Sequence, residues 1–218
     1  MIKFEHTEVF GWDAAIRGMR NPMNSWDKSD SGYCPRYDND PLYFGFKIGE
    51  NDLALMKKLS RAGSDHSKFL RMINVTADIT APRYWWTEYD TYKVGTVANS
   101  CSTMHKIHEK EFTLEDFSHE HLSPASIDLL QQIIKELNFF QNGNNQSPRL
   151  VDTKKYWWQM IQLLPQSYNQ KRTVQLNYQV LKNMYQARKN HKLDEWREFC
   201  KWCEELPYFK EICTEVTE

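Results

Sequence analysis

The feature that most constrains this chain is a strict alternation of apolar and polar residues in the segment from Phe69 to Ile79. The apolar positions are Ile73, Val75, Ala77 and Ile79. Successive side chains of a β-strand point to opposite faces, so this pattern predicts a strand with one buried face. The Ala81-Pro82 pair then ends the strand. The fold therefore contains a sheet.

Two helices are predicted before this strand. The first covers residues 13–20 (DAAIRGMR). The second begins where Asn51 or Asp52 caps it, continues as an apolar stripe and stops at Gly63. The segment between them, residues 21–49, holds three prolines with several Gly, Ser and Asp, which indicates turns and short strands.

Helices dominate the predictions after the strand. Residues 83–93 (RYWWTEYDTYK) fit either an aromatic helix or a further strand, because periodicity does not distinguish the two. A later helix begins at Ser123-Pro124, a cap followed by proline at the first helical position, and ends at the NGNN of 142–145. Three more span 155–164, 173–188 and 194–206.

The order of these elements predicts the fold class. A strand-rich first half followed by a helical second half favours an α+β class, or α/β with an antiparallel sheet. A length of 218 residues suits one domain covering 1–218 and does not require two.

Composition gives no support for a membrane or nucleic-acid partner. The chain is 40% hydrophobic with a formal net charge of −1, so bulk charge does not favour nucleic-acid binding. No apolar run approaches the roughly 20 residues that span a bilayer, and the first residues do not read as a secretory signal. Five cysteines are an odd number, which argues against a disulfide framework. We expect a soluble, cytoplasmic protein.

Two groups of potential metal ligands do not form convincing metal sites. Cys200 and Cys203 make a CxxC pair, but a structural zinc site takes four ligands and the sequence has no second pair. Both lie on the apolar stripe of the last helix, which favours core packing. His105, His108 and the HEH of 119–121 lack a carboxylate or cysteine that completes a set. We expect no metal.

The most unusual tract is TEYDTYKVGTVANSCSTMH at 87–105. It gathers carboxylates, tyrosines, a lysine, hydroxyls and an amide within a few turns, directly after Trp85 and Trp86. Polar groups beside an apolar platform are typical of a ligand pocket wall. The alternatives are a solvated loop for the tract and core packing for the two tryptophans.

The second half of the chain carries the strongest match to a known family. Residues 163–188 read LLPQSYNQKRTVQLNYQVLKNMYQAR. This resembles the pattern LLP…(Y)T.f..tvN.RsL..Fl.lR of the flavin-dependent thymidylate synthases, the ThyX family. Asn177 and Arg188 fall at matching spacing. The family's phosphate-binding arginine becomes Lys171, which keeps the charge but loses the bidentate fork, and a second arginine becomes Gln179.

Further segments show the same resemblance in the same order. Residues 55–86 are similar to the family segment l..ll..gH.spfEH..ftf.i.API.v.rQ, with Arg71 in place of its flavin-contacting histidine. Residues 13–21 resemble an early Ala-Ala-Arg helix. The sequence DEWREFCKW resembles the family's AQ.EIR helix, with Arg197 as the counterpart of its arginine.

The family signature RHR..S.NE.S.R aligns with residues 91–103 when Ala-Pro is used as the anchor. Lys93 takes the place of the third signature residue, and Thr96 takes the place of the serine. Asn99 and Ser100 lie one residue late for Asn-Glu. The first arginine, the histidine and the last arginine are absent, so the departures fall on residues that hold flavin and nucleotide.

The resemblance implies a ThyX-like single domain, with an antiparallel sheet, flanking helices and a helical C-terminal half. It also implies a homotetramer whose intersubunit sites bind dUMP, FAD, a folate methylene donor and NADPH. The implied reaction is reductive methylation at pyrimidine C5 with hydride from the flavin. We expect a pyrimidine nucleotide as ligand, with FAD as a candidate cofactor. NADPH and methylenetetrahydrofolate are expected only if the methyltransferase reaction is retained.

The residue-by-residue comparison gives two sets of expected contacts, and no catalytic residue is assigned. The nucleotide contacts are Glu88, Lys93, Thr96, Asn99, Ser100, Lys171 and Arg197. The cofactor contacts are Arg71, Tyr92, Lys93, Asn177, Gln179 and Arg188. One alternative is a non-catalytic descendant that has lost flavin and binds a nucleotide or a protein partner. Another is a fold that has changed its ligand altogether.

Overall fold

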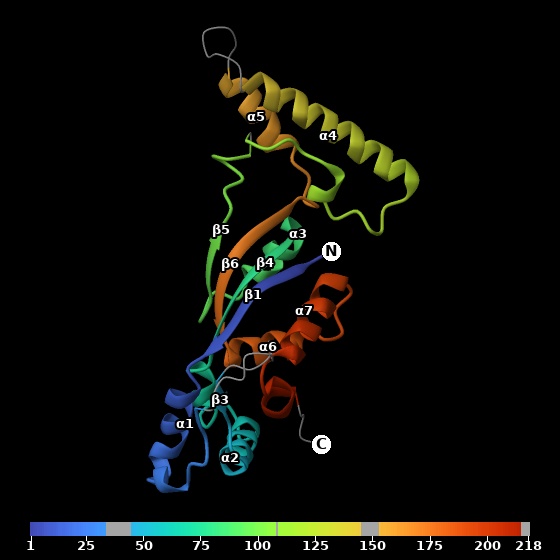
Figure 1. The fold of residues 1–218 in the computed structure, drawn as a ribbon. Coiled ribbons are helices and arrows are strands. Elements are labelled where there is room, and N and C mark those ends of the chain that lie inside the picture. The colour runs from blue at the N-terminus through green and yellow to red at the C-terminus, as the bar shows by residue number, and fades with distance from the viewer. Residues whose placement is uncertain (34–44, 108, 145–152, 215–218) are drawn as a thin grey trace. The chain divides into compact units, whose positions relative to one another are not determined.

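The computed structural model describes residues 1–33, 45–107, 109–144 and 153–214, and Figure 1 shows its strands and helices. One sheet has four strands in the order β1-β4-β6-β5. These strands are β1 Lys3–Phe10, β4 Asn74–Pro82, β6 Asn169–Asn177 and β5 Val97–Ser100. A second sheet pairs β2 (Gly32–Tyr33) antiparallel with β3 (Phe46–Lys47), with Gly32 opposite Lys47.

Helices occur throughout the described chain and confirm the predicted α+β class. They are α1 Trp12–Arg20, α2 Glu50–Arg61, α3 Arg83–Tyr89, α4 Pro124–Asn144, α5 Thr153–Leu163, α6 Tyr178–Arg188 and α7 Asp194–Glu205. Short 3-10 turns include η3 (Lys68–Arg71), and a π turn, η5, covers Lys210–Thr214.

The chain divides into two compact units, each built from three stretches of sequence. Unit 1 comprises Met1–Lys3, Ile79–Thr91 and Asn99–Thr173. Unit 2 comprises Phe4–Asp78, Tyr92–Ala98 and Val174–Glu218. We describe each unit by itself. The expectation of one domain covering the whole chain stays a prediction.

Strand β4 confirms the alternation that opened the sequence analysis. Val75 and Ile79 are 0% exposed and Ala77 is 1% exposed, while the polar residues between them are half-buried. Residues 83–93, which fit helix or strand, form α3 followed by a turn.

The prediction of a helix over 173–188 is wrong in its first part. Strand β6 runs to Asn177, and only α6 is helical. Val174 and Leu176 are buried while Gln175 is exposed, which is the period of a strand. The Asn177 side chain accepts a hydrogen bond from the amide of Val180 at 3.1 Å, so it caps α6. The second half of the chain is therefore not purely helical.

The predicted start of α2 is also wrong. Its N-cap is Gly49, and the carboxylate of Asp30 accepts hydrogen bonds from the first-turn amides of Asn51 at 2.8 Å and Asp52 at 3.0 Å. Asp52 is instead 0% exposed and accepts a hydrogen bond from Arg20 Nε at 2.6 Å. The predicted stop is confirmed, because Gly63 has a φ of +102°, a conformation that favours glycine.

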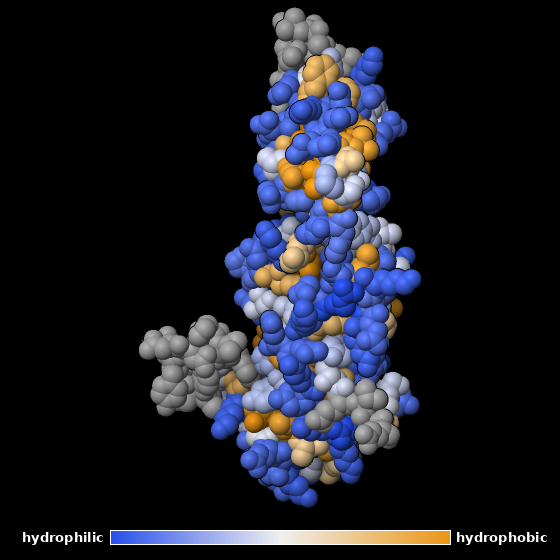
Figure 2. Space-filling view, turned by 90° about the vertical axis from the view of Figure 1, so that its right-hand side faces the viewer, coloured by the Kyte–Doolittle hydropathy of each residue, from blue (hydrophilic) through white to orange (hydrophobic). Residues whose placement is uncertain are grey.

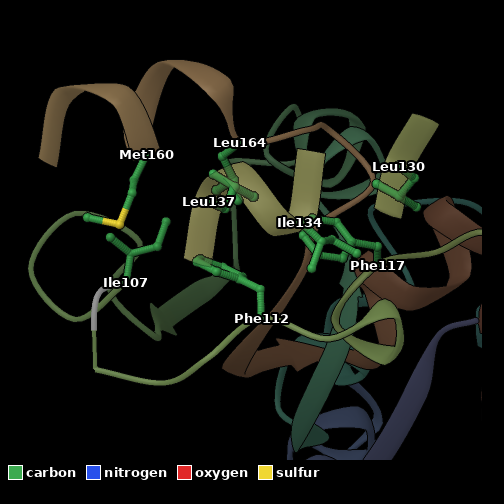
Figure 3. Packing of buried hydrophobic residues seen from close by; sticks show 8 residues of the cluster. All are labelled: Ile107, Phe112, Phe117, Leu130, Ile134, Leu137, Met160 and Leu164. Atoms are coloured by element: carbon green, nitrogen blue, oxygen red, sulfur yellow. The ribbon is translucent and has the colours of Figure 1, made fainter. Parts of the chain in front are cut away.

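Helices α4 and α5 pack together in unit 1 and enclose its hydrophobic cluster (Figures 1 and 3). The predicted cap is confirmed, because the amide of Ser126 donates to Ser123 Oγ at 3.3 Å. The side chains that converge in the cluster are Leu130, Ile134 and Leu137 of α4, Met160 of α5, and Leu164, Ile107, Phe112 and Phe117 from adjoining segments.

Helices α6 and α7 contribute to the core of unit 2, together with α1, η3 and β4. Leu181 and Met184 of α6 and Phe199 of α7 are 0% exposed. Cys200 and Cys203 lie in the same core, which confirms their predicted packing role. Burial raises the pKa of the Cys200 thiol to about 11, so this thiol is protonated at neutral pH.

The face shown in Figure 2 is mainly hydrophilic, with separate hydrophobic areas among the polar residues. Exposed hydrophobic side chains within α4 and α5 include Leu129, Phe139 and Trp158. Within the described ranges, none of the helices is both long and apolar enough to cross a bilayer.

Candidate functional site

Among the predicted ligand contacts in unit 2, Arg188 has a hydrogen bond to one aromatic residue and cation–π contacts with two aromatic rings. Arg188, the last residue of α6, donates from Nε to Tyr92 Oη at 2.9 Å. Its guanidinium carbon lies 4.7 Å from the ring centroid of Trp196 and 5.6 Å from that of Tyr92. Cation–π attraction and the hydrogen bond hold this guanidinium in one orientation. We call Tyr92, Arg188 and Trp196 the Arg188 cluster.

The turn that follows Tyr92 packs closely against the start of α6. Thr96 Oγ1 donates to the carbonyl of Tyr92 at 2.6 Å, which closes the turn. Gly95 has a φ of +76°, and a Cβ there would lie 3.0 Å from Asn177 Nδ2 and 3.0 Å from Val180 Cγ2. The backbone conformation therefore favours glycine here, and a larger residue would press on both side chains.

The other predicted cofactor contacts in unit 2 serve partly structural roles. Gln179 Oε1 accepts from Ser67 Oγ at 2.9 Å, and its Nε2 donates to Asn183 Oδ1 at 3.1 Å. Both ends of this amide are thus engaged within unit 2. Arg71 of η3 and Lys93 are exposed cations.

Arg197, a predicted phosphate ligand, holds the segment before α7. Its Nη1 donates to the carbonyl of His191 at 2.9 Å and to the carbonyl of Lys192 at 3.1 Å. Its Nη2 forms an ion pair with Asp194. These contacts join the start of α7 to the segment before it. The phosphate role of Arg197 stays a prediction.

In unit 1, the structure brings three of the predicted nucleotide contacts onto neighbouring strands. Strand β5 carries Asn99 and Ser100, both exposed, and pairs with β6, which carries the half-buried Lys171. The amide of Cys101 donates to the carbonyl of Lys171 at 2.9 Å and continues this pairing. Glu88 lies apart from them in sequence, on α3, and is half-buried.

A second arginine, Arg172, was not among the predicted ligand contacts. It contacts residues at the start of the polar tract 87–105 and just before it. The guanidinium carbon of Arg172 lies 4.2 Å from the ring centroid of Trp86, and its Nη1 donates to Asp90 Oδ1 at 2.7 Å. Trp86 Nε1 donates to the carbonyl of Gln170 at 2.9 Å, and Gln170 Nε2 donates to the carbonyl of Cys101 at 2.9 Å. These bonds fix the tract to β6.

The two tryptophans of this region are core residues. Trp85 is 0% exposed and Trp86 is 1% exposed, so of the two predicted roles the structure shows packing. Tyr89 packs on both rings, and burial raises the pKa of its phenol.

A pocket of about 300 Å³ opens beside the end of the polar tract, entirely within unit 1. Cys101 and Ser102 form one wall, and Tyr168 and Asp116 line it from adjoining segments. The remaining lining residues are Lys106, Ile107, Lys110, Glu111 and Phe112. We call this the Tyr168 pocket.

Among the residues that the structure describes, no three His, Cys, Asp or Glu side chains gather in a way that could hold a metal ion. Cys34 and His108 lie outside these residues.

Comparison with known proteins identifies the architecture. No family model and no curated protein matches the sequence. A solved flavin-dependent thymidylate synthase ThyX from Helicobacter pylori, complexed with FAD and dUMP, matches with a TM-score of 0.66 over 99% of this chain and 100% of that chain, at 15% identity. A second ThyX structure from the same organism, with FAD and dUMP, gives 0.65 at 16% identity over 98% and 97% of the two chains. The chain has the ThyX fold.

A third structure, of a protein described as a methylase, also matches. The UMP/dUMP methylase PolB from Streptomyces cacaoi, bound with 5-Br dUMP, matches with a TM-score of 0.60 and 13% identity over 99% of this chain and 96% of that chain. The ThyX fold thus appears here with a sequence only 13–16% identical to those of these three structures.

Sequence reasoning predicted a pocket wall in residues 87–105, which includes Cys101 and Ser102, but it missed the lining residues of segment 106–116, which carries no family motif. Lys106 and Lys110 stand four residues apart, a spacing that a search for paired cations would find. Tyr168 gives no such signal, since it lies more than fifty residues away and reaches the pocket only through the fold.

Proposed function

We propose that this chain binds a pyrimidine nucleotide of the dUMP type together with a flavin, and acts in modification of the pyrimidine at C5. The observation that carries the proposal is the extent of the ThyX fold, which covers 99% of this chain and 100% of a chain solved with FAD and dUMP. A similar match to a UMP/dUMP methylase supports a pyrimidine nucleotide in particular.

The proposed nucleotide contacts are assigned unit by unit. In unit 1, Lys171 supplies a point charge for phosphate, and Asn99 and Ser100 on the neighbouring strand supply amide and hydroxyl groups, with Glu88 as a further polar contact. In unit 2, the proposed contacts are Lys93, Thr96 and Arg197. Each set can be tested by substitution without reference to the other.

The residues of unit 2 fit the chemistry of a flavin dinucleotide. Arg71 and Lys93 are exposed cations suited to a diphosphate. Tyr92 and Arg188 present an oriented phenol and guanidinium, while Asn177 and Gln179 hold the segment that carries them. Bound FAD would supply hydride chemistry, with NADPH and methylenetetrahydrofolate needed only for complete methyl transfer. As part of the same proposal, we expect the protein to form a homotetramer and to be located in the cytoplasm.

The second candidate function is a non-catalytic ThyX-fold protein that binds a nucleotide or a protein partner without flavin. The observation that favours it is the engagement of two arginines within unit 2. Arg188 is held by Tyr92 and Trp196, and Arg197 donates to carbonyls before α7. A ligand would have to share these groups.

An absorbance spectrum of the purified protein, before and after addition of FAD and dUMP, separates the two functions. Flavin bands near roughly 375 and 450 nm that stay with the protein through gel filtration support the first function. Protein that stays colourless after incubation with FAD contradicts flavin binding. Calorimetry with dUMP then decides whether a nucleotide site remains.

Lys171→Ala tests the proposed phosphate contact. The variant should bind dUMP more weakly by about 1–3 kcal/mol, the scale of a hydrogen bond to a charged group. Titration calorimetry measures this change. Lys201→Ala, which removes an exposed lysine of α7, is the control and should bind dUMP like the parent protein. Equal affinity of all three proteins would remove Lys171 from the site.

A further inference from the structure

We propose that the Tyr168 pocket is a binding site for a small ligand that carries a phosphate or carboxylate group on an apolar body. The inference requires neither flavin nor chemistry at pyrimidine C5, so it stands apart from the proposed function. Nothing in the family resemblance assigns a role to the segment that forms most of the pocket.

The size and enclosure of the pocket suit a small organic ligand. Its volume of about 300 Å³ lies at the lower end of the range for small-molecule sites. Ile107 and Phe112 are 5% and 4% exposed, so the apolar side of the pocket is part of the core of unit 1. Asn138 of α4 holds the backbone of Phe112 with two hydrogen bonds, of 2.8 and 2.9 Å. This wall is therefore preformed.

Two neutral hydroxyls in the pocket are available as donors. Ser102 Oγ accepts hydrogen bonds from the amides of Met104 at 3.3 Å and His105 at 2.9 Å, which leaves its own proton to donate. Burial, with Asp116 and Cys101 adding to it, raises the pKa of the Tyr168 phenol. The phenol is therefore protonated at neutral pH and can donate to a ligand oxygen.

Two lysines add charged donors at the exposed side of the pocket. Lys106 pairs with Glu109, and Lys110 Nζ lies 2.9 Å from Asp116 Oδ1. An ammonium group has three donors, so each lysine keeps donors for a ligand while its ion pair stays intact. Exposed pairs of this kind are weak and impose little cost on a lysine that turns toward a ligand.

The pocket has two acidic residues, Asp116 and Glu111, and their negative charges differ in how far neighbouring donors compensate them. Asp116 Oδ2 already accepts from the amide of Thr113 at 2.8 Å and from its hydroxyl at 3.1 Å, in addition to the Lys110 pair at Oδ1. Its charge is thus compensated locally. Glu111 is exposed and lines the pocket, so its carboxylate should repel an anionic ligand. The charged lining residues are two lysines and two acids, so the donors of Ser102, Tyr168 and the lysines, and not a net positive charge, would recognise an oxyanion.

Cys101 provides a direct reporter of occupancy. Its thiol is exposed and lines the pocket, whereas Cys200, Cys203 and Cys213 are buried. In a Cys34→Ser background, the rate of reaction with a disulfide reagent therefore reports on Cys101. The probes are inorganic phosphate, dUMP, benzoate and uncharged deoxyuridine. We expect dUMP or benzoate to slow the reaction in a saturable manner, and deoxyuridine to have a much smaller effect.

The two ligand sources give different outcomes in this assay. Protection by dUMP but not benzoate identifies a phosphate ester in this pocket if Lys106→Gln or Lys110→Gln weakens the protection. Protection that neither variant weakens assigns dUMP to the proposed contacts Asn99, Ser100 and Lys171, which adjoin Cys101, and overturns the phosphate ester here. Protection by benzoate but not dUMP identifies a carboxylate. Stronger protection by either than by inorganic phosphate supports the apolar body. Absence of protection by all four probes overturns the proposal, and equal protection by deoxyuridine overturns the oxyanion.

Charge variants test the assignment of residues. Lys106→Gln and Lys110→Gln should each raise the concentration needed for protection by about tenfold, the loss expected for one charge-assisted contact. Glu111→Gln should lower it, because a repulsive charge is removed. Lys201→Gln is the matched control, since Lys201 is also an exposed lysine paired three residues away, with Glu198. An unchanged concentration in all four variants would contradict an oxyanion site at these lysines.

Discussion

Asp52 gathers hydrogen bonds from two separate segments of unit 2. Its carboxylate accepts from Arg20 Nε at 2.6 Å, from Ser29 Oγ at 2.8 Å, and from the amide and hydroxyl of Ser31 at 3.1 and 2.6 Å. Arg20 and Asp52 are 4% and 0% exposed. This carboxylate therefore ties α1 and the loop after it to α2.

Substitution of Asp52 should destabilise the protein strongly. Asp52→Ala leaves the Arg20 guanidinium buried without its partner, which costs about 3–5 kcal/mol in the free energy of unfolding. Urea denaturation followed by circular dichroism measures this difference. Asp13→Ala removes an exposed ion pair with Arg17 and should change the free energy by less than about 1 kcal/mol. Similar losses in the two variants would contradict the buried network.

The same carboxylate should make stability depend on pH in the acid range. Burial acts to raise the pKa of Asp52, but hydrogen bonds from Ser31, Ser29 and Arg20 outweigh it and hold the pKa below its ordinary value. A lowered folded-state pKa stabilises the fold fully above the unfolded pKa of about 4, and this contribution is lost as pH falls through the folded pKa. Denaturation midpoints between neutral pH and pH 3 should therefore fall less steeply for Asp52→Ala than for the parent.

Sequence alone could not reveal this role of Asp52. An acidic residue before an apolar stripe is a common helix cap, and that local reading predicted a cap. The actual partners lie at Arg20 and in residues 29–31, and only tertiary packing brings them to the carboxylate. The predicted contacts Tyr92 and Arg188 did come together, because one follows the α3 turn and the other ends α6 on the same side of unit 2.

At the level of elements, the sequence predicted what the hydrophobic pattern encodes. The buried face of β4 and the apolar stripes of α4 and α7 gave clear periods. Strands β1 and β5 are mostly exposed, so they have no apolar alternation to detect. The end of β6, residues 173–177, was merged with α6 because Asn177, the cap between them, lay inside the expected helix.

Asn177→Ala tests the boundary between β6 and α6. Loss of the hydrogen bond from the Val180 amide should lower the free energy of unfolding by about 1 kcal/mol, the typical value of an N-cap. Asn183→Ala, in the interior of α6, is the control and should be neutral or stabilising because alanine has the higher helix propensity. Urea denaturation measures both. A neutral Asn177→Ala would place the energetic start of α6 elsewhere.

Leucines on two sides of α4 test the packing of unit 1. Leu137 is 0% exposed in the cluster of Figure 3, and its replacement by alanine should cost about 2–5 kcal/mol in the free energy of unfolding. Leu129 on the same helix is 58% exposed, so Leu129→Ala should change that free energy by less than about 0.5 kcal/mol. Calorimetric unfolding of the two variants compares one chemical change at two levels of burial.

For the whole molecule, the order of weak motifs was more informative than any single motif. Segments near residues 13–21, 55–86 and 163–188 resembled the family in the same order, and the ThyX fold covers 99% of the chain. The site was less accessible to this reasoning. Lys106 and Lys110 belong to a segment that matches no family pattern, whereas Tyr168 belongs to the matched segment 163–188, and only the fold brings them to one pocket.

Because each unit consists of three separate stretches of the chain, neither unit can be produced as one continuous fragment. Unit 1 draws on Met1–Lys3, Ile79–Thr91 and Asn99–Thr173, and unit 2 occupies the gaps between them. No single cut of the gene can therefore encode either unit intact. During synthesis, unit 2 cannot complete its fold until Val174–Glu218 has left the ribosome, which happens long after its first stretch has emerged. An insertion or fusion that respects both units has to fall at a surface loop inside one stretch, and not at a junction between stretches.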